Sequence, residues 1–276
     1  MKTCLQDTVS ILRQVKVKKL INMGFLRRFI KIIGVIFVFA KTLIIASFTV
    51  RGYSAKARQK AASLTCQWAQ SLCKVIKLKV HINGNISDFE TGTLVVSNHL
   101  GYTDILVCGS IFKLAFAPKK EMQSWPILGW LTSLNRPVWI DRKNQLSTAK
   151  TLEEMSVVLQ DKVNLIVYPE GTTTDGLNGL LPFKSTAFAA AVQCHCPIQP
   201  ILITYSCLPT DGGPVPWFGD EALLSHIWRL LNLKEIHAQV YIMPIVMPNA
   251  GESRKDLAHR VYALMENEYS KVFKND

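Results

Sequence analysis

Residues 93–104 read TLVVSNHLGYTD. At the start of this stretch the apolar residues do not alternate with polar ones. Such a pattern is typical of a strand that is covered on both faces of its sheet. An imidazole at His99 and a carboxylate at Asp104 follow, five positions apart. Five helical steps of about 100° place two side chains on different faces of one helix, so this pair can meet only across a turn, which Gly101 permits. The stretch predicts a strand, a turn and a helix that starts at Thr103 or Asp104.

A polar pair at this place has a chemical use. A carboxylate that accepts the Nδ1 proton fixes the tautomer of an imidazole and leaves Nε2 free to take a proton from a hydroxyl. In open α/β sheets, ligands sit at the carboxyl ends of the strands. A single histidine beside a turn is more often structural, so His99 and Asp104 by themselves are a weak indication of a base.

The rest of the chain, from about residue 79, alternates short apolar runs with helical stretches, which favours an α/β domain. A length of 276 residues suits one large domain, or one domain plus an appendage. The C-terminal helix has a capping-box-like start at Ser253 and Asp256. Other expected helices are 121–133, 147–162 and 185–194, and the expected strands are 79–83, 93–97, 114–117, 138–141, 164–168, 198–205 and 239–246.

The positive charge is concentrated at the N-terminus. The net charge is +12, but residues 1–80 hold 16 Lys or Arg against one acid, Asp7, and the remaining residues carry more acids than bases. Basic groups around apolar sequence are attracted to an anionic leaflet by about 1 kcal/mol each. The pattern therefore indicates a membrane surface as partner and disfavours nucleic acid.

Residues 32–50 form the longest apolar run, about 28 Å if helical against a bilayer core of about 30 Å. Placing the charged side chain of Lys41, which lies at the centre of this run, in the middle of the bilayer costs about 2.5–3.5 kcal/mol of insertion free energy. A partly inserted helix with Lys41 at the interface therefore competes with a full span, and a signal peptide is disfavoured because no cleavage site follows. The amphipathic stretch 56–79 either packs on the domain or completes a helical hairpin in one leaflet. We expect 1–78 to be membrane-associated helices and 79–276 the α/β domain.

The seven cysteines are an odd number without CxxC spacing, which indicates reduced thiols. Cys194, His195 and Cys196 resemble part of a metal site, but no second ligand pair follows at zinc-site spacing. We expect no metal and interpret these residues as a helix end with buried thiols.

Two more polar segments follow expected strands. Residues 168–176, YPEGTTTDG, combine glycines with a run of hydroxyls, which suits close approach to a phosphate or polar head group, although a plain turn is the alternative. Residues 138–142 end in Arg142, whose guanidinium could bind a phosphate through two hydrogen bonds or form a surface ion pair.

These segments together resemble the glycerolipid acyltransferase family, typified by the 1-acyl-sn-glycerol-3-phosphate acyltransferases. Residues 98–104 look like its NHxxxxD motif, 139–142 like its second motif, 169–172 like its third and 197–201 like its proline-containing fourth. The resemblance implies a glycerol-3-phosphate acyltransferase-like fold, α/β with a mixed, mostly parallel sheet flanked by helices, and an N-terminal membrane-associated helical segment.

The resemblance also implies a function. A membrane-bound O-acyltransferase would move a fatty acyl group from acyl-CoA or acyl carrier protein to the hydroxyl of a lysophospholipid, first of all 1-acyl-sn-glycerol-3-phosphate, giving phosphatidate. It would work among membrane lipids at the cytoplasmic face of the inner or plasma membrane, without a cofactor beyond the donor. His99 would be the general base and Asp104 would orient it. The substrate would be bound by Asn98, Arg142, Glu170, Gly171, Thr172, Thr173 and Lys184.

Two departures from the family's pattern bear on the acceptor. Thr173 stands where the third motif often has arginine, and Arg136 and Pro137 precede Val138 where the second motif usually has glycine. The missing cation leaves lysophosphatidylcholine-like or lyso-aminolipid acceptors open beside lysophosphatidate. The alternatives from other classes are a non-catalytic membrane lipid-binding protein and a hydrolase that releases fatty acid.

Overall fold

The computed structural model describes residues 2–86, 92–125, 128–133, 135–141, 145–208 and 213–274. Six strands form one sheet in the order β1-β6-β5-β2-β4-β3. Every neighbouring pair is parallel except β5 and β6. The expected mixed, mostly parallel sheet is therefore confirmed. The strands are β1 (Leu78–Asn83), β2 (Leu94–Ser97), β3 (Leu114–Phe116), β4 (Asn164–Val167), β5 (Ile198–Cys207) and β6 (Ile236–Ile242).

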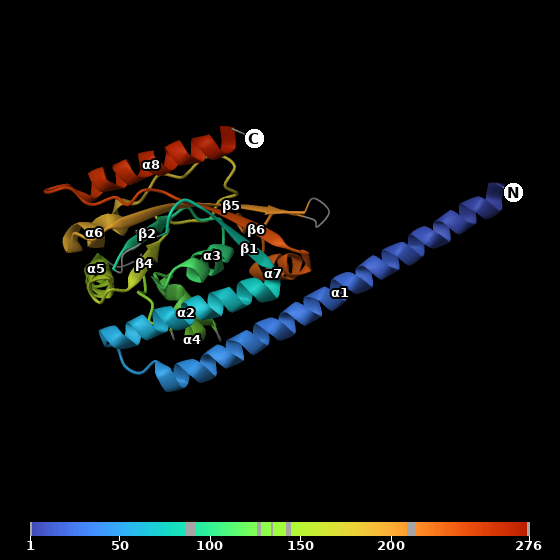
Figure 1. Cartoon of the computed structure of the whole chain (residues 1–276), viewed down its shortest axis with the longest axis horizontal. Coiled ribbons are helices and arrows are strands. Elements are labelled where there is room, and N and C mark those ends of the chain that lie inside the picture. Colours follow the sequence, from blue (N-terminus) through green and yellow to red (C-terminus); the bar gives the residue numbers. More distant parts are fainter. Residues whose placement is uncertain are drawn as a thin grey trace.

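Helices cover both faces of the sheet (Figure 1). On one side lies α8, and on the other α3 lies between the sheet and α2, with α1 beyond α2. The helices are α1 (Lys2–Thr49), α2 (Ala55–Ile76), α3 (Thr103–Ile111), α4 (Leu128–Ser133), α5 (Gln145–Gln160), α6 (Ala189–Cys194), α7 (Leu223–Asn232) and α8 (Arg254–Lys274), with 3-10 turns η1 (Lys120–Ser124) and η2 (Ser185–Phe188).

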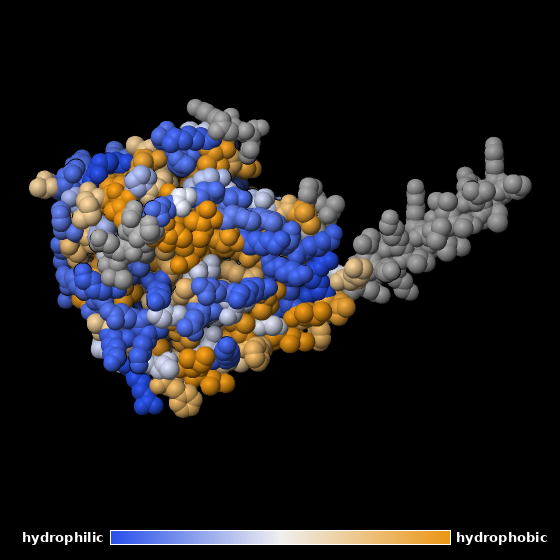
Figure 2. All heavy atoms as spheres, viewed as in Figure 1, coloured by the Kyte–Doolittle hydropathy of each residue, from blue (hydrophilic) through white to orange (hydrophobic). Residues whose placement is uncertain are grey.

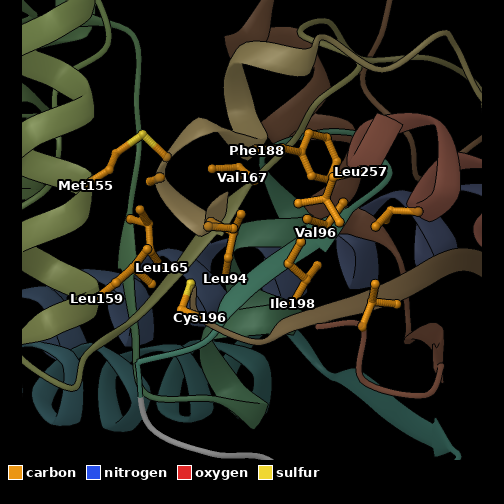
Figure 3. Packing of buried hydrophobic residues seen from close by; sticks show 14 of the residues in the cluster. Leu94, Val96, Met155, Leu159, Leu165, Val167, Phe188, Cys196, Ile198 and Leu257 are labelled. Carbon is orange, nitrogen blue, oxygen red and sulfur yellow. The ribbon is translucent and has the colours of Figure 1, made fainter. Parts of the chain in front are cut away.

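The central strands are apolar throughout because both of their faces are buried. In β2, Leu94 and Val96 belong to the cluster that packs against α5 and α8, and Val95 belongs to the cluster on the α2 and α3 side. Figure 3 shows Val96 beside Leu257 of α8 in the first cluster, and Leu94 nearer to Leu165 and Cys196. A strand with two buried faces fixes the position of the polar loop that follows it.

Several expected elements differ from the structure. The expected strand 138–141 is wrong: in this described stretch Ile140 makes only an isolated bridge to Lys119. The Val138 amide donates to the carbonyl of Phe116, the last residue of β3, and the Ile140 amide donates to that of Pro118 just beyond it, so the pairing is too short for a strand. The expected helix 121–133 is two short pieces, η1 and α4, and 185–194 is η2 followed by α6. The last expected strand begins earlier, at Ile236, and α7 was not expected.

The N-terminal helices form a hairpin against the domain. The buried stripe of α2 packs on α3, which is one of the two alternatives that its amphipathic pattern left open. Ser54 caps the start of α2 by accepting from the Ala57 amide. The turn between α1 and α2 is held by Arg136, which donates to the carbonyls of Gly52 and Val50 at 3.1 and 3.3 Å. The Arg136 guanidinium also lies over the ring of Tyr53. The C-terminal end of α1 is thereby fixed to the body.

Further toward the N-terminus, α1 binds the end of α7. Lys31 is only 3% exposed, and its Nζ donates to the carbonyl of Leu233 at 2.7 Å. Arg28 donates to the Trp228 carbonyl at 3.2 Å and stacks over the Trp228 ring, and Arg27 donates to the carbonyl of Asn232. Carbonyls at a helix C-terminus lack intrahelical donors and favour cations. Part of the N-terminal positive charge therefore joins α1 to α7.

By length and composition, the segment Met23–Thr49 of α1 could cross a membrane, and most of it is not buried in the protein. Figure 2 shows hydrophobic residues along the side of the molecule on which α1 runs. Exposed apolar side chains there include Phe29, Ile36, Phe37, Ile44 and Phe48. The protein therefore presents an apolar helix on one flank of an otherwise folded domain.

Candidate active site

The polar pair expected from the sequence forms at the carboxyl end of β2. His99 Nδ1 lies 2.8 Å from Asp104 Oδ2. Asp104 sits in the first turn of α3 and is fully buried, whereas the His99 side chain is 21% exposed. Because Nδ1 faces the carboxylate, Nε2 is the ring nitrogen that is left to accept a proton. Among the described residues, no hydrogen-bond partner contacts that nitrogen.

Asp104 is held by more than the imidazole. Its Oδ2 also accepts the backbone amides of Leu100 and Gly101, at 2.7 and 3.0 Å. Its Oδ1 accepts the hydroxyl of Tyr205, on β5, at 2.8 Å. A buried carboxylate needs such donors to remain charged. The side chain of Asp104 therefore has both oxygens occupied and one orientation.

Hydrogen bonds of Glu170 and Thr174, which both follow β4, join the segment of the third motif to the backbone of His99 in the first motif. Both oxygens of Glu170 accept backbone amides: Oε1 that of His99 and Oε2 that of Leu181, each at 2.9 Å. The amide of Thr174 donates to the carbonyl of His99 at 3.0 Å. Burial raises the pKa of the Glu170 carboxyl, and the two amides partly offset this. Glu170 is 4% exposed, so its geometry is that of a residue positioning His99.

The side chain of Asn98, like that of Glu170, hydrogen-bonds to the protein backbone. Its amide nitrogen donates to the carbonyl of Ile203 at 2.9 Å, and its oxygen accepts the amide of Ile203 at 2.8 Å. The side chain is buried and continues the pairing of β2 with β5 beyond the last strand residue. Asn98 therefore fixes the start of the loop that carries His99.

Gly171, Lys184, Thr172 and Thr173 lie on the outer side of the third motif. Gly171 has φ +74°, which favours glycine at this turn, and the exposed side chain of Lys184 crosses close to its Cα. Lys184 and Thr172 are exposed and Thr173 is half-buried. Among the described residues the Lys184 ammonium has no acceptor. Arg142 lies outside the described residues.

Residues outside the expected site complete the surroundings of the pair. The ring of Tyr168 stacks on His99, with centroids 4.1 Å apart and planes 17° apart. The hydroxyl of Tyr102 lies 2.8 Å from Nδ1 of His226, which is fully buried on α7, and the amide of Trp217 donates to the Leu100 carbonyl at 2.7 Å. Burial raises the pKa of Tyr102 and lowers that of His226, so both stay neutral. Tyr168 adjoins the third motif in sequence, whereas Trp217 and His226 gave no local signal.

The segment Cys194–Cys196 forms the end of α6 and the residues just after it. α6 ends at Cys194, and His195 is its left-handed cap with φ +47°. Cys196 is buried and Cys194 is half-buried. Within the described ranges, no group of three His, Cys, Asp or Glu side chains is arranged to hold a metal ion.

The described residues bring together the parts of a general base. A histidine with a fixed tautomer stands at the carboxyl edge of the sheet, backed by a buried carboxylate, beside an exposed lysine and threonine hydroxyls. Such a pair suits proton transfer from a hydroxyl, and the apolar helix on the flank of the sheet suits an amphipathic substrate.

Comparison with known proteins identifies the group. The family described as "Acyltransferase" matches residues 77–204. The lyso-ornithine lipid O-acyltransferase of Pseudomonas aeruginosa is 32% identical over 199 residues, which cover 71% of this chain and 74% of that protein. The 1-acyl-sn-glycerol-3-phosphate acyltransferase of Neisseria gonorrhoeae is 26% identical over 170 residues, covering 62% and 66%.

A solved structure shares the fold. The crystal structure of the 1-acyl-sn-glycerophosphate acyltransferase from Thermotoga maritima aligns with a TM-score of 0.64 at 21% identity, over 94% of this chain and 97% of that one. The chain belongs to the glycerolipid acyltransferase family, as its four motifs predicted. It is an acyltransferase that acts on lysolipids.

Proposed function

We propose that this protein transfers a fatty acyl group from acyl-CoA or acyl carrier protein to the hydroxyl of a lyso-ornithine lipid or a closely related lyso-aminolipid. The observation that carries the choice of acceptor is the charge of the third motif. Between residues 169 and 184 the only cation is Lys184, and Thr173 stands where an arginine is common in the family. A phosphate monoester carries a charge of about −1.5 to −2 at neutral pH, whereas an ornithine head group has a single carboxylate and an ammonium.

Similarity to lyso-ornithine lipid O-acyltransferases supports the same acceptor. Besides the Pseudomonas protein, that of Rhizobium meliloti is 28% identical over 209 residues, covering 70% of each chain. The second candidate is 1-acyl-sn-glycerol-3-phosphate, the first expectation from the sequence. The Neisseria relative favours it, as does the ammonium of Lys184, which has no acceptor within the part of the chain that the structure describes.

The proposed reaction needs no covalent enzyme intermediate. His99 Nε2 accepts the proton of the acceptor hydroxyl as its oxygen bonds to the thioester carbonyl carbon. The tetrahedral intermediate collapses, the carbon–sulfur bond breaks, and the imidazolium returns the proton to the leaving thiolate. Asp104, 2.8 Å from Nδ1, stabilises the imidazolium between these two transfers. One ester and one free thiol result.

We also propose that α1 lies within one leaflet at the cytoplasmic face, where the donors are found. Two contacts support this orientation over a full span. Lys31 binds the end of α7 and the Val50 carbonyl binds Arg136, so the apolar stretch between them is tied to the body at both ends (Figure 1). A helix that crossed a bilayer would carry one of these ends away from the domain. Lys41 is exposed and can reach the head groups.

The deciding experiment uses the purified, detergent-solubilised full chain and its His99→Ala variant. Each is incubated with labelled acyl-CoA or acyl carrier protein and with lyso-ornithine lipid, lysophosphatidate or lysophosphatidylcholine, and products are identified by mass. Acylation of lyso-ornithine lipid in preference to the others, and a loss of about 10²- to 10⁴-fold in the variant, is expected. A preference for lysophosphatidate would refute the proposal that lyso-ornithine lipid is the acceptor. Wild-type turnover by His99→Ala would refute the base.

A further inference from the structure

The carboxylate of Asp104 has a second anchor that lies outside all four motifs. Tyr205 donates its hydroxyl to Oδ1 at 2.8 Å, while His99 and two backbone amides occupy Oδ2. The two residues are 101 positions apart in the chain. The contact therefore depends on the fold and not on the local turn that brings His99 to Asp104.

The sheet explains how Tyr205 reaches this place. β2 ends at Ser97, opposite Ile201, whereas β5 continues to Cys207. Tyr205 thus lies four residues past the last pair of the ladder, beside the loop that follows β2. The reciprocal hydrogen bonds of Asn98 with Ile203 set the register between this loop and the extension of β5. A side chain two residues further along β5 from Ile203 is then directed at Asp104 by the strand period.

We propose that Tyr205 is a positioning residue for the His99–Asp104 pair. This inference rests on the proposed role of His99 as the base. With one oxygen bound by Tyr205 and the other by the loop amides, the carboxylate cannot rotate, and Oδ2 stays in line with Nδ1. The Tyr205 hydrogen bond also withdraws charge from the carboxylate, which lowers its ability to hold a proton on the imidazole.

The phenol is a dependable donor because it is kept neutral. Burial and the neighbouring carboxylate of Asp104 raise the pKa of Tyr205 well above its ordinary value. The other titratable groups facing the pair are Cys108 from α3, and Tyr168 and Glu170 after β4. Burial raises the pKa of the Cys108 thiol and of the Tyr168 phenol. Among the described residues facing Asp104, no cation but protonated His99 would compete for the carboxylate.

The test compares Tyr205→Phe with Tyr262→Phe in the full-length enzyme. Tyr262 on α8 also donates a phenol hydroxyl to an internal acceptor, the Leu180 carbonyl at 3.2 Å, but it does not touch the pair. Tyr205→Phe should lower kcat about 10- to 100-fold, as expected for a lost hydrogen bond to a charged group, with KM for both substrates within about twofold. The acid limb of its kcat/KM profile should move to higher pH, because the less-bound carboxylate holds the imidazolium proton more tightly. Tyr262→Phe should show neither change.

A double-variant cycle separates positioning from a general loss of structure. In an Asp104→Asn background, removal of the Tyr205 hydroxyl should have little further effect on kcat, because its only proposed route to the reaction is through that carboxylate. Independent, additive losses would overturn the proposal, as would a Tyr205→Phe enzyme with the kcat and acid limb of wild type. His99→Ala keeps the two proposals apart. If it is inactive while Tyr205→Phe is normal, only the role of Tyr205 fails, and if it is active, the base assignment itself fails.

Discussion

Glu170 accepts the backbone amide of His99 at 2.9 Å while its other oxygen accepts the amide of Leu181. One buried carboxylate thus joins the turn that carries the proposed base to the loop that carries Lys184. The resemblance to the family implies that Glu170 binds the substrate, and this stays a prediction; in the structure both of its oxygens accept backbone amides. Its effect on catalysis would therefore pass through the position of His99.

Replacement of Glu170 by glutamine tests this geometry. The amide group of glutamine can accept at one end only, so one buried N–H loses its partner, at a cost of about 1–3 kcal/mol. We expect a lower kcat, a nearly unchanged KM and reduced thermal stability. Glu252→Gln is the control for a general loss of stability, since Glu252 also accepts a backbone amide, that of Asn249 at 2.8 Å, and pairs with Arg260, but on the N-terminal side of α8. A rise in acceptor KM alone in Glu170→Gln would instead indicate contact with the substrate.

The same residue predicts a pH dependence of stability. Burial raises the pKa of Glu170 above its ordinary value of 4.5, so the native state binds this proton more tightly than the unfolded chain. The stability that this more tightly bound proton contributes to the native state is complete below pH 4.5. It is lost as the pH rises through the raised pKa. The stability difference between wild type and Glu170→Gln should therefore shrink as the pH rises. Thermal unfolding of both proteins across this range measures it, and a constant difference would contradict the raised pKa.

Local sequence was sufficient for the centre of the site. The strand, turn and helix around His99 and Asp104 follow from an apolar run, a glycine and a helix start, all within twelve residues. The buried strands of the sheet and the order of the four motifs could also be predicted from the sequence. Tyr205, Trp217 and His226 were not, because each reaches the turn from a distant segment through the register of β5 or the packing of α7. The expected strand at 138–141 failed because its backbone pairs only with the last residue of β3 and the few residues after it, which is too short a partner for a strand.

The attachment of α1 to α7 predicts different roles for two lysines of one helix. Lys31 is buried and donates to the Leu233 carbonyl, whereas Lys41 is exposed in the apolar stretch. Lys31→Met should destabilise the protein by about 1–3 kcal/mol, because the carbonyl at the end of α7 loses a charged donor. It should also speed amide hydrogen exchange near the C-terminus of α7. Lys41→Met should alter neither and should bind vesicles at least as well as wild type. Equal behaviour of the two variants would show that the contact with α7 does not fix α1.

The charge of the third motif predicts that one substitution can change acceptor preference. Thr173→Arg restores the cation that is common in the family at this position, beside Gly171 and Lys184. A charge-assisted hydrogen bond contributes about 1.5–3 kcal/mol, so the ratio of kcat/KM for lysophosphatidate to that for lyso-ornithine lipid should rise about 10- to 100-fold. Asn178→Arg, which adds the same charge on the exposed continuation of this loop, should leave the ratio near its wild-type value. If both variants raise it equally, general electrostatic attraction accounts for the effect. If neither does, the head group is selected elsewhere, and the Thr173 departure does not explain which lysolipid this enzyme acylates.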